Sequence, residues 1–125
     1  MRGPLILVVE DDLDTREAVV EVLRREGLSV VATDGGQEAL DLLETCRPHL
    51  VLLDLDLVGL GGEEFCAAQR TLPELTATPV VIMTGMNDPP QLGAALLRKP
   101  FGIDELLAVV ARFVAPDLAA AAPVP

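Results

Sequence analysis

Polar residues follow four separate apolar runs in the chain. They are Glu10 and Asp11 after LILVV, Asp54 after LVLL, Thr84 after VVIM, and Lys99 after LLR. If these runs are strands of an open parallel sheet, their carboxyl ends share one edge, where such sheets bind ligands. We therefore expect three carboxylates, a hydroxyl and an ammonium group to meet in one pocket. Three carboxylates repel one another unless a cation lies among them, so the pocket would hold a cation.

Lys99 strengthens this expectation because it is the only lysine among nine basic residues. The others are arginines, so a compact ammonium point charge stands at the proposed pocket. The alternative interpretation is an ordinary surface lysine that precedes a turn. The acidic residues after the other runs favour the pocket.

Composition limits the classes of function that need to be considered. A length of 125 residues suffices for one domain with a hydrophobic core. A net charge of −11 argues against direct binding of nucleic acid and favours cations and basic protein surfaces. No apolar run is long enough for a membrane span and no signal-peptide pattern is visible, so we expect a soluble, cytoplasmic protein. Cys46 and Cys66 are expected to be reduced thiols without a metal, and His49 a surface residue.

Short β-branched runs alternate with stretches of helical periodicity. The predicted strands are residues 5–9, 29–33, 50–53 and 80–83 and the LLR run. Four helices are predicted. The first begins at Asp14, with Glu17 in a capping box, and ends at Gly27, and the second opens at Gly35 and Gly36. The third runs through Phe65 and Ala68, and the last spans Ile103 to Val114. This alternation predicts an α/β fold with a parallel sheet between two helical layers.

The first predicted helix is expected to turn Ala18, Val19, Val22 and Leu23 toward the core. Residues 115–125 lack periodicity and are almost all Ala, Pro and Val. We expect a linker or a disordered end there, with an extension of the last helix beyond Pro116 as the alternative.

The motifs LILVVEDD, HLVLLDLDLVGLGG, VVIMTG and LLRKPF, in this order, resemble those of receiver domains of two-component response regulators. The resemblance runs from about Leu5 to Val114. It implies a flavodoxin-like fold, with a doubly wound, five-stranded parallel sheet of order 2-1-3-4-5, in a receiver domain over residues 1–114. It also implies a phosphorylation-dependent switch in signal transduction, with at most slow self-dephosphorylation rather than enzymatic activity.

Matched position by position, the resemblance makes Asp54 the phosphoacceptor. It places Thr84 and Lys99 in contact with the phosphoryl group, and Lys99 before a cis peptide bond to Pro100. A hydroxyl and an ammonium group suit the charge that develops on phosphoryl oxygens.

The same match implies Mg²⁺ as the cation. Asp11 and Asp54 would be direct ligands, Glu10 would hold the ion through water, and the main-chain carbonyl of Asp56 would be a further ligand. Mg²⁺ prefers hard oxygen ligands and retains waters, so a few carboxylates and a phosphate oxygen suffice. Simple solvation is the expectation for Asp12 and Asp14.

Three features depart from the family pattern. Only 14 residues separate Thr84 from Lys99, so the fourth helix is predicted to be shortened or absent. Leu96 occupies the position where many relatives carry an aromatic that changes rotamer on phosphorylation, and Val58 replaces the usual proline.

The resemblance implies a histidine kinase or a histidine phosphotransfer protein as the phosphoryl donor, whereas the downstream protein or fused domain stays open. Met1 at the start favours a stand-alone receiver or the amino-terminal part of a longer regulator. The short fourth region resembles that of receivers attached to hybrid kinases.

Two alternatives belong to other classes of function. The run from Asp54 to Val58 matches the DxDxV signature of haloacid-dehalogenase-like phosphatases, in which Asp56 would be a general acid. That reading leaves Glu10 and Asp11 unexplained, and such enzymes usually need a longer chain. A receiver-shaped interaction module that takes no phosphate is suggested by the missing helix, but the complete set of polar site residues argues against it.

Overall fold

The computed structural model describes residues 4–57, 61–73 and 76–121. Five strands and four helices form in this part of the chain. They are β1 (Leu5–Val9), α1 (Leu13–Arg25), β2 (Ser29–Thr33), α2 (Gly36–Cys46), β3 (Leu50–Asp54), α3 (Gly62–Arg70), β4 (Val80–Thr84), β5 (Ala95–Arg98) and α4 (Ile103–Ala121). The predicted strands are confirmed, with boundaries that differ by at most one residue.

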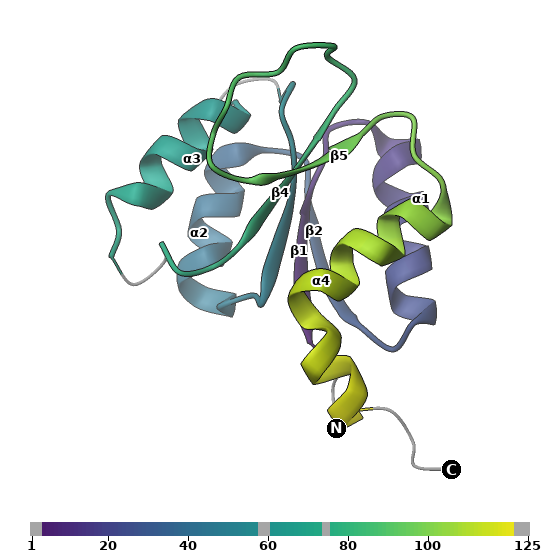
Figure 1. Cartoon of the computed structure of the whole chain (residues 1–125). Coiled ribbons are helices and arrows are strands. Elements are labelled where there is room, and N and C mark those ends of the chain that lie inside the picture. Colours follow the sequence, from purple (N-terminus) through teal and green to yellow (C-terminus); the bar gives the residue numbers. More distant parts are fainter. Residues whose placement is uncertain (1–3, 58–60, 74–75, 122–125) are drawn as a thin grey trace.

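The strands form one sheet in the order β2-β1-β3-β4-β5, and every neighbouring pair is parallel. Helices α2 and α3 cover one face, and α1 and α4 cover the other (Figure 1). The predicted doubly wound α/β fold is therefore confirmed. Because all strands run the same way, their carboxyl ends lie along a single edge.

Side chains alternate across each strand, so the sheet has a separate core on each face. In β1, Ile6 and Val8 pack with α1 and α4, whereas Leu7 and Val9 pack with α2 and α3. Strand β3 is buried along its whole length, as expected for a central strand covered on both sides. Asp54 thus stands at the end of the most enclosed strand.

Helix α1 begins earlier than the sequence pattern indicates. Its N-cap is Asp12, whose carboxylate accepts a hydrogen bond from the main-chain N–H of Thr15 at 2.9 Å. The predicted start at Asp14 is therefore wrong, and Asp12 is a capping residue rather than a merely solvated one. The predicted end is confirmed, because Gly27 follows the helix with a φ of 84°, a conformation that favours glycine.

The predicted inner face of α1 is confirmed in part. Val19 and Leu23 are buried and Val22 is half-buried, but Ala18 is exposed. Ala18 lies instead beside a hollow between α1 and the segment that follows β5. The buried stripe of this helix is thus narrower than the sequence indicates.

The segment between β4 and β5 contains no helix over residues 85–94. This confirms the prediction drawn from its short length. Helix α4, in contrast, continues past the predicted end at Val114 to Ala121. The structure thus shows the alternative of a longer last helix as far as Ala121, and whether residues 115–125 serve as a linker stays a prediction. Val58 and Gly59 lie outside the described residues.

Candidate functional site

The predicted site residues come together at the carboxyl edge of the sheet. Glu10 and Asp11 directly follow β1, and Asp54 is the last residue of β3. Carboxylate oxygens of these three residues all lie within 4.8 Å of one another. The Nζ atom of Lys99 lies 2.7 Å from Oε1 of Glu10 and 3.5 Å from Oδ1 of Asp54. Residues separated by up to 89 positions thus share one cluster.

Burial differs sharply among the members of this cluster. Glu10 is completely buried and Asp54 is only 3% exposed, whereas Asp11 is exposed. The side chain of Lys99 is 28% exposed. The cluster therefore has a closed inner half, formed by Glu10 and Asp54, and an outer half that is open to an incoming ligand.

The pKa of Glu10 is raised to about 7. Burial disfavours its charge, and a hydrogen bond to Asp54 favours its protonated form, while Lys99 partly opposes both effects. For Asp54, burial acts to raise the pKa, but hydrogen bonds from Glu10 and from the Asp56 N–H, together with Lys99, lower it overall. Asp54 is therefore the ionised member of the buried pair at neutral pH.

Lys99 keeps its charge in this environment. Burial acts to lower its pKa, but its hydrogen bond to Glu10 and the nearby charge of Asp54 raise the pKa overall. Two negative partners thus outweigh the loss of solvent around one ammonium group. A permanent cation is held beside both buried carboxyls.

Thr84 and Asp56 lie next to this cluster and form hydrogen bonds with Lys99, Met86 and Asp54. The Thr84 carbonyl accepts a hydrogen bond from the Lys99 N–H at 2.7 Å, and its hydroxyl accepts one from the Met86 N–H at 3.0 Å. The Asp56 N–H donates to Oδ1 of Asp54 at 3.1 Å. The peptide bond between Lys99 and Pro100 is cis, as the family resemblance implies.

The structure also shows contacts that the sequence pattern does not predict. Arg16 donates a hydrogen bond to the main-chain carbonyl of Glu10 at 2.9 Å and so fastens α1 to the end of β1. Gly62 lies so close to β3 that an added Cβ would come within 2.9 Å of the Leu55 Cα atom. An arginine one helical turn into α1 carries no distinctive sequence signal, whereas a pair of glycines at the start of α3 is a detectable one.

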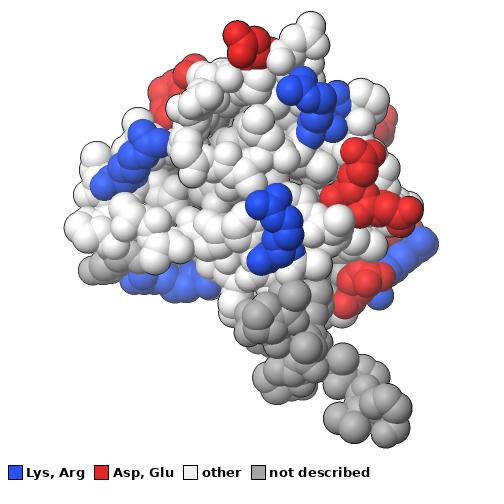
Figure 2. Space-filling view, viewed as in Figure 1, with Lys and Arg blue, Asp and Glu red and all other residues white. Residues whose placement is uncertain are grey.

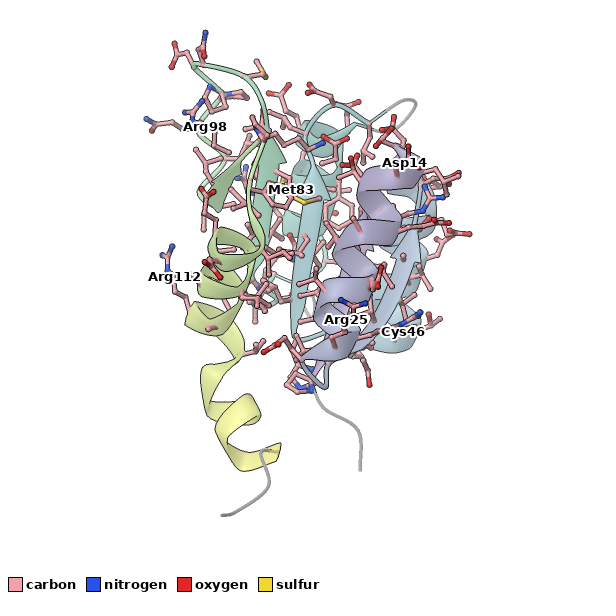
Figure 3. All side chains as sticks on the ribbon, turned by 90° about the vertical axis from the view of Figure 1, so that its right-hand side faces the viewer. Asp14, Arg25, Cys46, Met83, Arg98 and Arg112 are labelled. Atoms are coloured by element: carbon pink, nitrogen blue, oxygen red, sulfur yellow. The ribbon has the colours of Figure 1, made fainter. Side chains whose placement is uncertain are left out.

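Cys46, Cys66 and His49 lie outside this cluster. Cys46 and Cys66 are free, with Cys66 buried, and burial raises the pKa of the Cys66 thiol. His49 is exposed and accepts a hydrogen bond from the Leu5 N–H at 3.0 Å. Cys46 lies at the end of the molecule opposite Asp14 and Arg98, and therefore far from the carboxyl edge (Figure 3).

The family model of the response regulator receiver domain matches residues 6–111. The chain belongs to the receiver domain family. Response regulator MprA of Mycolicibacterium vanbaalenii is 36% identical over 110 residues, which cover 82% of this chain and 47% of that protein. This receiver domain thus spans about half the length of the curated relatives that it matches.

Solved structures agree with this assignment. A putative response regulator from Chloroflexus aurantiacus is 29% identical, with a TM-score of 0.85 over 91% of this receiver domain and 99% of that chain. The receiver domain of sensor histidine kinase PA1611 from Pseudomonas aeruginosa, solved with a magnesium ion in its active-site cleft, is 24% identical, with a TM-score of 0.82 over 90% and 98%. The second likeness supports the fold alone.

None of the helices in the described part of this receiver domain combines the length and the hydrophobicity that crossing a bilayer requires.

Proposed function

We propose that Asp54 of this receiver domain accepts a phosphoryl group, with Mg²⁺ as the cofactor, and that the modification switches its interactions with a partner. The observation that carries this proposal is the cluster of three carboxylates and one ammonium group at the carboxyl edge of the sheet. Asp54 is the ionised member of the buried pair and lies near both the other carboxylates and the ammonium group. It is therefore the nucleophile of this set.

The donor set suits Mg²⁺. Oε2 of Glu10 is buried and has no hydrogen-bond partner among the described residues, so this oxygen lacks a partner that a hydrated cation would supply. Asp11 and Asp54 would hold the ion directly, Glu10 through water, and Asp56 through its main-chain carbonyl. When bound, the ion neutralises carboxylate repulsion and the negative charge of the phosphoryl oxygens.

The transfer of the phosphoryl group itself is carried out by residues of the protein. An oxygen of Asp54 forms a bond to phosphorus while the bond from phosphorus to the donor breaks and the leaving group takes its electron pair. Lys99 presents its ammonium group beside Asp54, where it stabilises charge on the transferred oxygens. The Thr84 hydroxyl supplies a neutral donor, and Gly85 leaves the backbone accessible next to it.

The partner that fits this reaction is a histidine kinase or a histidine phosphotransfer protein. Both present a phosphohistidine, which is a reactive donor for a carboxylate. Curated relatives of about twice this length include DNA-binding response regulators such as MtrA, so a fused or separate output partner is part of the proposal. We place the reaction in the cytoplasm.

The test is incubation with Mg²⁺ and acetyl phosphate, followed by intact-mass measurement. The expected result is the gain of one phosphoryl group in the wild type and no gain in Asp54→Asn or when EDTA removes the metal. Asp56→Asn is the matched control, since only its carbonyl has a role here, and it should still be modified. Continuous release of phosphate from many phosphoesters, lost in Asp56→Asn, would support the phosphatase alternative. The absence of any reaction would support the unphosphorylated module.

A further inference from the structure

Two arginines fasten the helix-free segment 85–94 to the body of the domain. Arg98 of β5 donates a hydrogen bond to the main-chain carbonyl of Met86 at 2.6 Å. Arg70 of α3 donates one to the carbonyl of Leu92 at 2.7 Å. Because this segment forms no helix, these carbonyls are not used in a helical hydrogen-bond ladder.

The first of these attachments leads directly to the site. The N–H of Met86 donates to the Thr84 hydroxyl at 3.0 Å, while the carbonyl of the same residue accepts from Arg98. Thr84 and Arg98 are also paired in register across β4 and β5. A continuous path of two hydrogen bonds therefore runs from the Thr84 hydroxyl through Met86 to the Arg98 guanidinium.

Strand β5 turns two side chains, Leu96 and Arg98, toward solvent on one face. Leu96 lies two residues before Arg98 and is 47% exposed. It has no side-chain group that can form a hydrogen bond. Arg98 is the polar side chain that this face of β5 offers to the segment.

We infer that Arg98 is a positioning residue that couples the phosphoryl group on Asp54 to the position of segment 85–94. The inference rests on the proposed function. When the Thr84 hydroxyl moves toward the phosphoryl group, the Met86 N–H either follows it or loses it as a partner. Both outcomes shift Met86 and weaken its hydrogen bond to Arg98. Arg98 thus favours the unmodified arrangement, and phosphorylation favours the released one.

The surroundings leave room for this movement. A hollow of about 450 Å³ lies between the segment and the face of the sheet, lined among others by Ile82, Leu92, Leu96 and Arg98. Residues 87–94 line this hollow, so movement of the segment after release of Met86 would open it further and expose Ile82, which is now only 1% exposed. The modified domain would then present an apolar surface that the unmodified domain covers.

The experiment uses the whole chain with Mg²⁺ and beryllofluoride, a mimic of the phosphoryl group. Amide hydrogen exchange is measured by NMR at Met86 and along residues 85–94, and beryllofluoride affinity is measured by titration. In the wild type, addition of the mimic should increase exchange in the segment. In Arg98→Ala, exchange should already be faster without the mimic, and the mimic should bind about two- to ten-fold tighter, as expected from removal of one hydrogen bond.

Two variants separate this role from a simple effect of charge. Arg112→Ala removes an arginine from α4 on the same side of the molecule (Figure 3), and its contact in the structure is with the neighbouring Phe113 ring. It should behave like the wild type in both measurements. Arg98→Lys retains a charged donor and should recover part of the wild-type protection.

The outcomes are distinguishable from those of the proposed function. If Asp54 takes the phosphoryl group or its mimic, but exchange along the segment is unchanged, the coupling is overturned and the proposed function stands. Equal behaviour of Arg98→Ala and Arg112→Ala would overturn it as well. If mass measurement shows that the wild type takes no phosphoryl group, both proposals fail together.

Discussion

Glu10 and Lys99 form the pair that closes the inner half of the site. A fully buried carboxyl is costly when it is charged, and Lys99 at 2.7 Å supplies the compensating cation. The pair is asymmetric, because Lys99 is partly exposed and can turn toward a ligand, whereas Glu10 cannot leave. This arrangement keeps a positive charge beside Asp54.

Lys99→Ala should destabilise the metal-free protein by about 2 kcal/mol at pH 8. At that pH most Glu10 is ionised, because its pKa is about 7, and removal of the cation either leaves this buried charge unpaired or forces Glu10 to take up a proton. At pH 5.5 Glu10 is protonated and the loss should be clearly smaller. Urea unfolding in EDTA at the two pH values measures both quantities, with Arg112→Ala as the exposed control. An equal loss at both pH values would show that Lys99 does not compensate Glu10.

The convergence of the site residues was predictable from sequence because each one directly follows an apolar run. Parallel strands place such residues on one edge whatever their separation along the chain. The bond between Lys99 and Glu10 was not predictable, since it depends on rotamers and on the depth of each side chain. Arg98 was missed for a similar reason: its partner is a main-chain carbonyl in a segment without periodicity.

Among the elements, α1 connects the acidic turn to the rest of the domain. Its N-cap, Asp12, directly follows Asp11, and Arg16 of its first turns holds the carbonyl of Glu10. The start of the helix therefore sets the position of the two acidic residues after β1. Loss of the cap would loosen this turn as well as the helix.

Asp12→Ala should cost about 1 kcal/mol of unfolding free energy, since it removes the side chain that accepts from Thr15. Asp14→Ala is the matched control: this acidic residue in the first turn is not the cap, and its interaction with the helix dipole is worth about 0.3–1 kcal/mol when exposed. Denaturant unfolding at neutral pH compares the two. A larger loss for Asp14→Ala would restore the cap position that the sequence pattern predicted.

Strands were easier to predict than helix ends in this chain. The strands are short, almost continuous apolar runs, and burial on both faces leaves little choice of position for Leu50 to Leu53. At the start of α1, in contrast, Asp12 with Thr15 and Asp14 with Glu17 are two similar pairs, each with a spacing of three residues, and the two possible caps lie only two residues apart. The choice depends on where β1 ends in space, which the local sequence does not specify. The end of α4 was difficult to predict for a similar reason. A proline favours a helix end but does not fix it, and α4 continues past Pro116.

At the scale of the whole molecule, charge is distributed unevenly. The net charge is −11, yet the face that carries β5 and α4 shows basic side chains spaced over uncharged surface, with acidic groups toward one side and the upper rim (Figure 2). The basic side chains on this face are therefore spread out rather than gathered into one patch.

The acidic cluster should also give the whole domain an unusual dependence of stability on pH. Because the pKa of Asp54 is lowered on folding, its contribution is present above its ordinary pKa and is lost only in more acidic solution. The pKa of Glu10 is raised from 4.5 to about 7, so the folded state binds more protons than the unfolded state between these values. Stability should therefore fall as pH rises from about 5 to 7, by at most about 3 kcal/mol.

Urea unfolding in EDTA between pH 4.5 and 8 measures this fall, and Glu10→Gln is the control that should remove it. Mg²⁺ should reverse the trend, because it binds the ionised carboxylates of the folded state and stabilises that state in proportion to the logarithm of its concentration. The pair of curves with and without metal should therefore diverge as pH rises. Parallel curves, or a metal-free stability that increases over this range, would show that the buried acidic pair does not govern the stability of the domain.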